Sequence, residues 1–339
     1  MISLETLILI TILSPLLVCL LTPFLSSKPI LRDILGPIGG IISSWGAIRL
    51  MTSVLNGDQP RLELLQIAEG ISISFVVTPL GAVFGLVASV LWIFAAIYSV
   101  GYMRGNKEAN QTRFYVFYAM AVHAALCIAY AGDLLTLFIF YEVLTFSTYP
   151  LVTHKQNELA QKAGRLYMSI LVGTSVILLL PAIIWVWVVT GSLEMSQNGV
   201  LDGNINPEYA PYLLAMFVFG IGKAALIPIH KWLPAAMVAP TPVSALLHAV
   251  AVVKAGVFTM LLILTNVFGI EFLSKTGASN WLVWLASFTL LTTSIIAIYK
   301  DDLKARLAYS TISQLSYITL GGALASSLAT QGATLHIIT

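Results

Sequence analysis

The 339-residue chain is 58% hydrophobic and only 9% charged, with a net charge of +2 and a mean hydropathy of +0.91. Soluble proteins carry about 25% charged residues. The composition therefore excludes a soluble globular protein and indicates one that crosses a membrane several times. The chain has two cysteines, Cys19 and Cys127, both in apolar runs, and five histidines. We therefore expect no disulfide framework, no metal site, and no Fe–S or haem cofactor.

Runs of about 20 apolar residues are long enough to cross a bilayer as helices. The first run, Leu4 to Leu25, lacks a preceding basic region and a cleavage site, so we interpret it as a retained helix rather than a signal peptide. The alternating stretch Ile71 to Val76 predicts a short strand outside the membrane. Without any long soluble stretch, the sequence predicts one all-α polytopic domain with an eleventh span beginning near 331 and ten complete spans: 4–25, 31–54, 78–102, 113–131, 133–153, 166–190, 209–236, 241–266, 280–299 and 303–327.

Basic residues gather in alternate loops between these spans. The opposite loops hold only Arg61 and Lys275, together with most of the loop acids. By the positive-inside rule, the basic loops are cytoplasmic and the N-terminus is outside. We expect a multi-pass protein of the cell inner (plasma) membrane in this orientation. The basic loops hold Lys28, Arg32, Arg104, Lys107, Arg113, Lys155, Lys162, Arg165, Lys300, Lys304 and Arg306.

Three ionisable residues interrupt apolar runs: Glu142, Lys223 and Lys254. At 1.5 Å per residue they lie ~14, ~21 and ~20 Å along their predicted helices, near the middle of a ~30 Å hydrocarbon layer. An ionisable group at this depth costs about 3 kcal/mol on insertion scales and usually belongs to an ion or proton route. The sequence therefore predicts proton or cation translocation. A purely structural ion cluster is the alternative.

Two histidines and a proline extend this pattern toward the cytoplasmic side. His230 follows Lys223 by two helical turns, on the same face if the helix continues, and His248 precedes Lys254. Histidine exchanges protons near neutral pH. Pro228 is expected to break the helix beside Lys223, as in the broken helices of transporters, although a simple kink is the plainer interpretation. We hypothesise that a Glu142–Lys223 pair switches the lysine between holding and releasing a proton.

Other polar residues in the spans have plainer interpretations. His123 is isolated and is expected to be a satisfied core histidine. Lys231, next to Trp232, is expected to extend to the interface. Asp133 begins a predicted helix, where an acid is favourable.

The motifs around these residues resemble a known family. The runs Gly222-Lys-Ala-Ala-Leu-Ile-Pro-Ile-His-Lys-Trp-Leu-Pro and Ala245-Leu-Leu-His-Ala-Val-Ala-Val-Val-Lys-Ala-Gly-Val are similar to the signature of proton-translocating, antiporter-like membrane subunits. Such subunits occur in respiratory complex I, in membrane-bound hydrogenases and in Mrp-type Na+/H+ antiporters. Asp302-Leu-Lys-Ala-Arg-Leu resembles the next signature of the family, and Phe140-Tyr-Glu-Val resembles its glutamate motif. The resemblance covers essentially the whole chain.

The resemblance implies an antiporter-like bundle with two inverted five-helix repeats, each containing a broken helix. On this basis, residues 4–112 hold three N-terminal helices, 113–266 the first repeat, and 280–339 an incomplete second repeat. The chain stops just inside the eleventh span, so we expect a fragment or a truncated gene product. The resemblance also implies a proton relay of Glu142, Lys223, Lys254, His248 and His230, with Pro228 at the helix break and His336 as the family histidine of the incomplete repeat.

Three functions remain open on the sequence. The first is proton translocation in an Mrp-type monovalent cation/proton antiporter, with a modest preference for its subunit-D-like branch from residues 141–155. The second is a proton-pumping subunit of a complex I-like NADH:quinone oxidoreductase or a hydrogenase, where the redox chemistry belongs to partner subunits. The third is a non-transporting structural subunit. Each implies other membrane subunits and the bilayer as partners, and none implies nucleic acid.

Overall fold

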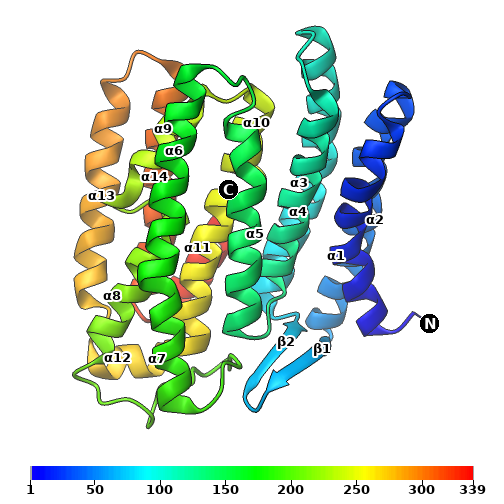
Figure 1. The fold of residues 1–339 in the computed structure, drawn as a ribbon. Coiled ribbons are helices and arrows are strands. Elements are labelled where there is room, and N and C mark those ends of the chain that lie inside the picture. The colour runs from blue at the N-terminus through cyan, green and yellow to red at the C-terminus, as the bar shows by residue number, and fades with distance from the viewer. Residues whose placement is uncertain (1, 339) are drawn as a thin grey trace.

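Long helices, roughly parallel to one another, form the body of the structure (Figure 1). The computed structural model describes residues 2–338, apart from the side chain of Ala249. The N-terminal helices are α1 (Leu4–Leu21, extended by the turn η1, Thr22–Leu25), α2 (Pro29–Leu55), α3 (Pro79–Gly105) and α4 (Gln111–Ala129). Among these, α1 packs against α2 and α4, and α2 packs against α3.

The remaining helices are more often interrupted. They are α5 (Leu134–Val152), α6 (Glu158–Thr174) continued through the π-turn η2 (Ser175–Leu179) into α7 (Leu180–Thr190), and α8 (Ala210–Gly220). A broken segment follows, with η3 (Gly222–Ala224), η4 (Ile229–Lys231), α9 (Trp232–Ala235) and η5 (Ala236–Val238). The last elements are α10 (Thr241–Ala245), η6 (Leu246–Val250), α11 (Val252–Leu262), η7 (Ile263–Phe268), α12 (Ile270–Thr276), α13 (Asn280–Ile298), α14 (Leu303–Ala323) and α15 (Ser327–His336).

Eight helical stretches among the described residues are long and apolar enough to cross a membrane. They correspond to eight of the ten predicted spans. The other two differ for physical reasons. The 209–236 span is helical only over the 11 residues of α8 before it breaks, and α14 carries too many hydroxyl and amide side chains to qualify by hydropathy. Instead, α14 packs along α13 and α11, which buries Ser316 and Thr319.

The predicted strand is confirmed as half of a hairpin. Strands β1 (Arg61–Ala68) and β2 (Ile71–Val76) pair antiparallel at the end of the molecule from which α1 starts (Figure 1). We call this the hairpin end. Gly70 makes the turn at φ +73°, and a side chain there would collide with the carbonyl oxygen of Gly191. The hairpin is thereby held against the 191–200 loop.

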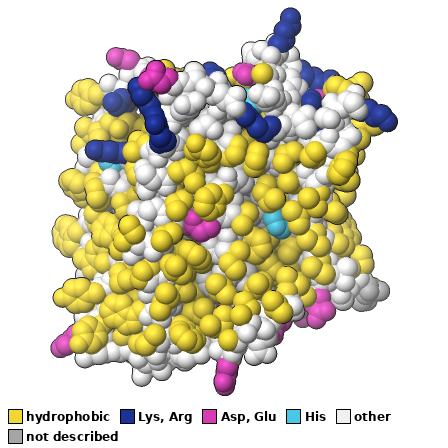
Figure 2. Space-filling model, in the orientation of Figure 1, with side chains coloured by type: hydrophobic (Ala, Val, Ile, Leu, Met, Phe, Trp, Pro, Cys, Tyr) yellow, Lys and Arg dark blue, Asp and Glu magenta, His cyan; other side chains and the backbone are white. Residues whose placement is uncertain are grey.

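The surface divides into an apolar belt and two polar ends. Figure 2 shows hydrophobic side chains over the middle of one face, Lys and Arg side chains near its upper end, and acidic side chains along its lower edge. The upper end holds the loops before α2, α4, α6 and α14, which are the loops with basic sequences. This arrangement suits a protein whose apolar belt contacts lipid and whose ends contact water.

Candidate functional site

Lys223 lies within a break between helices. Helix α8 ends at Gly220, because Ile221 leaves the helical conformation (ψ 63°) and Ala225 is left-handed at φ +55°. Gly220 also fits closely against the π-turn η2, where a Cβ would lie 2.5 Å from the Leu179 nitrogen. The expectation that Lys223 interrupts a continuous helix is therefore wrong, since the helix ends three residues before it.

The side chain of Lys223 is fully buried and is held by neutral groups of α5. Its Nζ donates to the carbonyl oxygen of Tyr141 at 2.9 Å and to Oγ1 of Thr145 at 2.6 Å. The same Nζ lies 3.1 Å from the centre of the Tyr141 ring, a cation–π contact. The Tyr141 hydroxyl in turn accepts from the Lys223 backbone N–H at 3.2 Å. The ammonium group thus has hydrogen-bond partners but no counter-ion in direct contact.

Glu142 follows Tyr141 on α5 but does not form the predicted ion pair. No carboxylate of the described residues lies within ion-pair distance of Lys223, although Glu142 interacts with it electrostatically. Both carboxylate oxygens of Glu142 are buried without a hydrogen-bond partner. Unpartnered buried polar atoms are rare and often functional. The structure therefore brings the two residues near each other and leaves the acid uncommitted.

Aromatic residues brace the broken backbone next to Lys223. Trp232 is fully buried, and its Nε1 donates to the carbonyl oxygen of Gly222 at 2.9 Å, which also accepts from the Ala225 N–H at 3.1 Å. The Tyr167 ring packs edge-on against Trp232 at 5.5 Å, and its hydroxyl shares a 2.6 Å hydrogen bond with Thr148 of α5. The broken backbone is thus satisfied within the protein, as it must be at membrane depth.

Lys254 lies on α11, close to the break but facing another element. Its Nζ donates to the carbonyl oxygen of Ile337, beside α15, at 2.7 Å. Two residues later, a Cβ on Gly256 would lie 2.4 Å from the backbone carbon of Lys223. The backbones of α11 and the break are therefore in contact, while the two lysine side chains bind to different helices, α5 and the α15 end.

The three candidate histidines share a partner that the sequence did not single out, helix α14. His248 lies 3.0 Å from Oγ1 of Thr311, His336 lies 2.9 Å from Oε1 of Gln314, and the His230 ring stacks obliquely on Tyr309 at 6.2 Å. His230 was expected to share a helical face with Lys223 if the helix continued past it. That is wrong, because no helix connects them, and its buried Nδ1 has no hydrogen-bond partner.

Pro228 lies within the break rather than at its start, since the backbone has already left the helix at Ile221. His123 is confirmed as a satisfied core residue, with its Nδ1 2.7 Å from the Ile12 carbonyl oxygen. Asp133 caps α5 by accepting from the Thr136 N–H at 2.7 Å.

The basic end holds an ion network that the sequence pattern did not reveal. Asp33 accepts from Arg32 at 2.8 Å and from Arg104 at 2.6 Å, and Arg32 also donates to Gln111 and Thr112. Asp33 and Arg32 are buried. The two arginines had been interpreted only as charges that set topology. Their spacing of about 70 residues gave no signal that one acid joins them.

Comparison with known families and proteins gives consistent matches. The family described as "NADH:quinone oxidoreductase/Mrp antiporter, TM" matches residues 131–339, and "NADH-Ubiquinone oxidoreductase (complex I), chain 5 N-terminus" matches residues 65–115. The chain is 27% identical over 320 residues to "Putative antiporter subunit mnhA2" of Staphylococcus haemolyticus (strain JCSC1435), covering 91% of this chain and 39% of that protein. It is 33% identical over 260 residues to a probable K(+)/H(+) antiporter subunit of Rhizobium meliloti (strain 1021), covering 75% and 25%.

Two solved structures share the fold. The Mrp complex from Dietzia sp. DQ12-45-1b superposes with a TM-score of 0.85 at 22% identity, covering 99% of this chain and 36% of that chain. The membrane-bound sulfane sulfur reductase, an archaeal respiratory membrane complex, also gives 0.85, at 23% identity, covering 99% and 68%. The chain thus spans about two fifths or less of the curated relatives described above. With a family match over residues 131–339 and this fold, the chain belongs to the transmembrane family of NADH:quinone oxidoreductase and Mrp antiporter subunits.

Proposed function

We propose that this chain forms the proton-conducting part of a multisubunit Mrp-type monovalent cation/proton antiporter. The relatives named above as antiporter subunits support this assignment. The single observation that carries it is Lys223, a fully buried ammonium held by neutral oxygens beside an uncommitted acid. Such a group can exist in both protonation states, because its direct partners are neutral oxygens and loss of the proton breaks no contact ion pair.

In the proposed relay, Glu142 and Lys223 act as one coupled unit. A charged Glu142 stabilises the ammonium of Lys223, and protonation or movement of Glu142 removes that stabilisation so that the proton leaves. Lys254 receives it on the neighbouring helix α11. His230 and His248 supply protons from the cytoplasmic side. His336 belongs to the next part of the proposed proton relay, after Lys254. Since these side chains do not touch one another, water must bridge the steps between them.

The proposal also includes placement and partners. The basic end faces the cytoplasm, the N-terminus and the hairpin face outward, and the membrane is the cell inner (plasma) membrane. The apolar belt contacts lipid and other membrane subunits. The transported ions are protons and a monovalent cation, either Na+ or K+. Residues 113–266 act as the first repeat, and residues after 280 begin a second one.

A second candidate is a proton-pumping subunit of a complex I-like assembly. The family description that includes NADH:quinone oxidoreductase and the likeness to an archaeal respiratory complex favour it. Both curated relatives named above are described as antiporter subunits, which favours the antiporter and leaves the subunit-D-like preference a prediction. Purification of the native assembly followed by mass spectrometry separates the two candidates, since only the second assembly contains Fe–S redox subunits.

The proton role is tested in membrane vesicles that contain the complete native assembly. Lys223→Ala should abolish cation-driven proton flux and Glu142→Gln should lower it at least about tenfold, while the assembly still purifies intact. The matched control is Lys231→Ala, because Lys231 lies in the same broken segment but is exposed. Unchanged flux in both relay variants would mean that the chain is a structural component of the assembly.

A further inference from the structure

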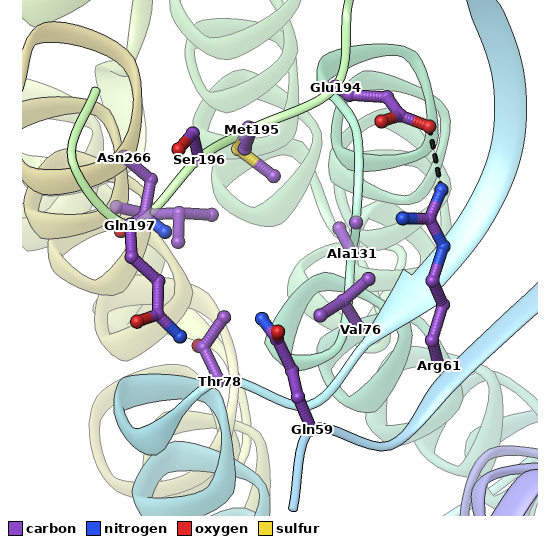
Figure 3. A pocket seen from close by; sticks show the side chains of 12 residues that line it. Gln59, Arg61, Val76, Thr78, Ala131, Glu194, Met195, Ser196, Gln197 and Asn266 are labelled. Atoms are coloured by element: carbon purple, nitrogen blue, oxygen red, sulfur yellow. Dashed lines mark hydrogen bonds and ion pairs between the residues drawn. The ribbon is translucent and has the colours of Figure 1, made fainter. Parts of the chain in front are cut away.

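A polar cavity of about 380 Å³ lies at the hairpin end, apart from the relay. Five segments surround it: the start of β1, the chain from the end of β2 to Thr78, the turn 131–132, the loop 194–197, and the end of α11 with the π-turn η7. Figure 3 shows the side chains of Gln59 and Gln197 extending into the space between these segments, with Arg61 and Glu194 joined at one side. The proposed relay uses none of these side chains.

Backbone hydrogen bonds hold the walls of this cavity together. The Met195 N–H donates to the Gly132 carbonyl at 3.2 Å, and the Ser196 N–H donates to the Asn266 carbonyl at 3.1 Å. Because the main chain provides the frame, the side chains are left available. Within the described residues, Gln59, Gln197 and Ser196 make no side-chain hydrogen bond to the protein. Uncommitted amide and hydroxyl groups in a preformed cavity are suited to a ligand.

The charges of the lining restrict that ligand. Arg61 and Glu194 form an ion pair of 2.6 Å and cancel each other, so the other polar side chains of the lining are uncharged amides and hydroxyls: Gln59, Thr78, Ser196, Gln197 and Asn266. A divalent cation usually requires carboxylate ligands, and among the described residues no group of three or more His, Cys, Asp or Glu side chains is placed to hold a metal ion. A phosphate or carboxylate is usually bound by several cationic groups, and the described lining holds no cationic side chain besides Arg61. Neutral oxygens can replace part of the hydration shell of a monovalent alkali cation.

We propose that this cavity binds a partly hydrated monovalent alkali cation, with Gln59 and Gln197 as neutral oxygen ligands. Glu194 provides the negative charge when Arg61 moves away from it. Both members of this pair are 49% exposed, so the ion pair is weak enough, about 0.2–1 kcal/mol, to be exchanged for a cation. The inference rests on the proposed antiporter function for the source of the cation, but not for the site itself.

A chain of contacts also connects the cation cavity to Lys223 of the proposed relay. Glu194 pairs along the backbone with Asp133, which caps α5, and α5 holds Lys223 through Tyr141 and Thr145. Asp133 in addition accepts from the N–H and hydroxyl of Ser74 in β2. A change at Glu194 therefore acts on the N-terminus of the helix that contacts the buried lysine.

The test is cation protection of a single introduced cysteine. Both cysteines of this chain are buried, so Ser196→Cys adds an accessible thiol at the hairpin end of the complete native assembly, and its labelling by a charged thiol reagent is counted as the excess over the assembly without the substitution. The control, Gln66→Cys, lies on the exposed face of β1 in the same hairpin. In Na+ or K+, the Ser196→Cys labelling rate should fall about fourfold at a cation concentration ~3 times its Kd, relative to choline at equal ionic strength. Labelling of Gln66→Cys should not change.

Equal labelling of Ser196→Cys in Na+, K+ and choline would overturn the proposal. Adding Glu194→Gln should remove the protection, and protection that persists would exclude Glu194 as the charge. Labelling is measured without a proton gradient, so it is independent of transport. Loss of protection with intact proton flux would reject the cavity alone, whereas retained protection with flux unaffected by Lys223→Ala would reject the antiporter function alone.

Discussion

Two clusters of charge in this molecule follow opposite rules. In the N-terminal helices, Asp33 is matched by Arg32 and Arg104 at 2.6–2.8 Å. In the helices that follow, Lys223 is fully buried and the carboxylate oxygens of the half-buried Glu142 are buried too, and among the described residues neither has an ionic partner in contact. A matched buried cluster resists any change of protonation, because the change would leave a charge unpaired. An unmatched one permits it, so the difference separates a structural cluster from the one proposed to carry protons.

The largest effect on stability is expected at the matched cluster. Asp33→Ala leaves the buried Arg32 guanidinium without its counter-charge, so the assembly should lose about 3–5 kcal/mol. Thermal unfolding in detergent measures this loss. Proton flux per intact assembly should stay at the wild-type level. The matched control is Glu158→Gln, which removes the exposed i,i+4 pair with Lys162 and should change stability by no more than about 0.5 kcal/mol.

The unmatched cluster should respond in the opposite sense. Glu142→Gln keeps the shape of the side chain and removes a charge that has no hydrogen-bond partner to lose. Proton flux should fall at least about tenfold, the factor for roughly 1.4 kcal/mol, while the unfolding midpoint changes little. If Glu142→Gln instead loses as much stability as Asp33→Ala, both clusters would have a structural role.

A smaller effect is expected where the break meets its neighbours. In Gly256→Ala, the new methyl group would lie 2.4 Å from the Lys223 backbone, so α11 or the break must shift. Overpacking of this kind costs about 1–3 kcal/mol. Both stability and proton flux should fall, since Lys223 and its contacts to α5 move with the backbone. Gly332→Ala is the control, because no atom lies near its added Cβ.

The sequence predicts those features of the two clusters that are visible among neighbouring residues, and it does not predict contacts between residues far apart in the chain. Lys223, Glu142 and Lys254 stand out because each is a charge within an apolar run, and the hairpin strand follows from simple alternation. The partners of these charges gave no such signal. Tyr141 and Thr145 have side chains that are ordinary in a helix. They lie about 80 residues before Lys223 in the sequence, and only the folding of the chain brings them into contact with it.

The break itself begins earlier than the sequence predicts, for a similar reason. Proline is an obvious helix breaker, so the pattern drew attention to Pro228. The helix ends earlier, at Gly220, where the backbone packs against the π-turn of the preceding helix. Helix α14 was predicted as a span, but its role as the shared neighbour of His230, His248 and His336 depends on tertiary packing alone.

The smallest effect is expected at an exposed pair, which completes the comparison. Glu271 and Lys275 form an i,i+4 ion pair of 2.9 Å on α12. The hydrogen bond and charge of Lys275 lower the pKa of Glu271 below its ordinary value of 4.5. The pair therefore stabilises the fold above that pH, and its contribution disappears as the pH falls through the lowered value. Because water screens both groups, Glu271→Gln should leave the unfolding midpoint at pH 7 unchanged within error, and added salt should make no difference. A clear loss of stability in Glu271→Gln would mean that the solvent exposure of a charge pair does not determine its strength in this protein. The different effects expected for Asp33→Ala and Glu142→Gln would then need another cause.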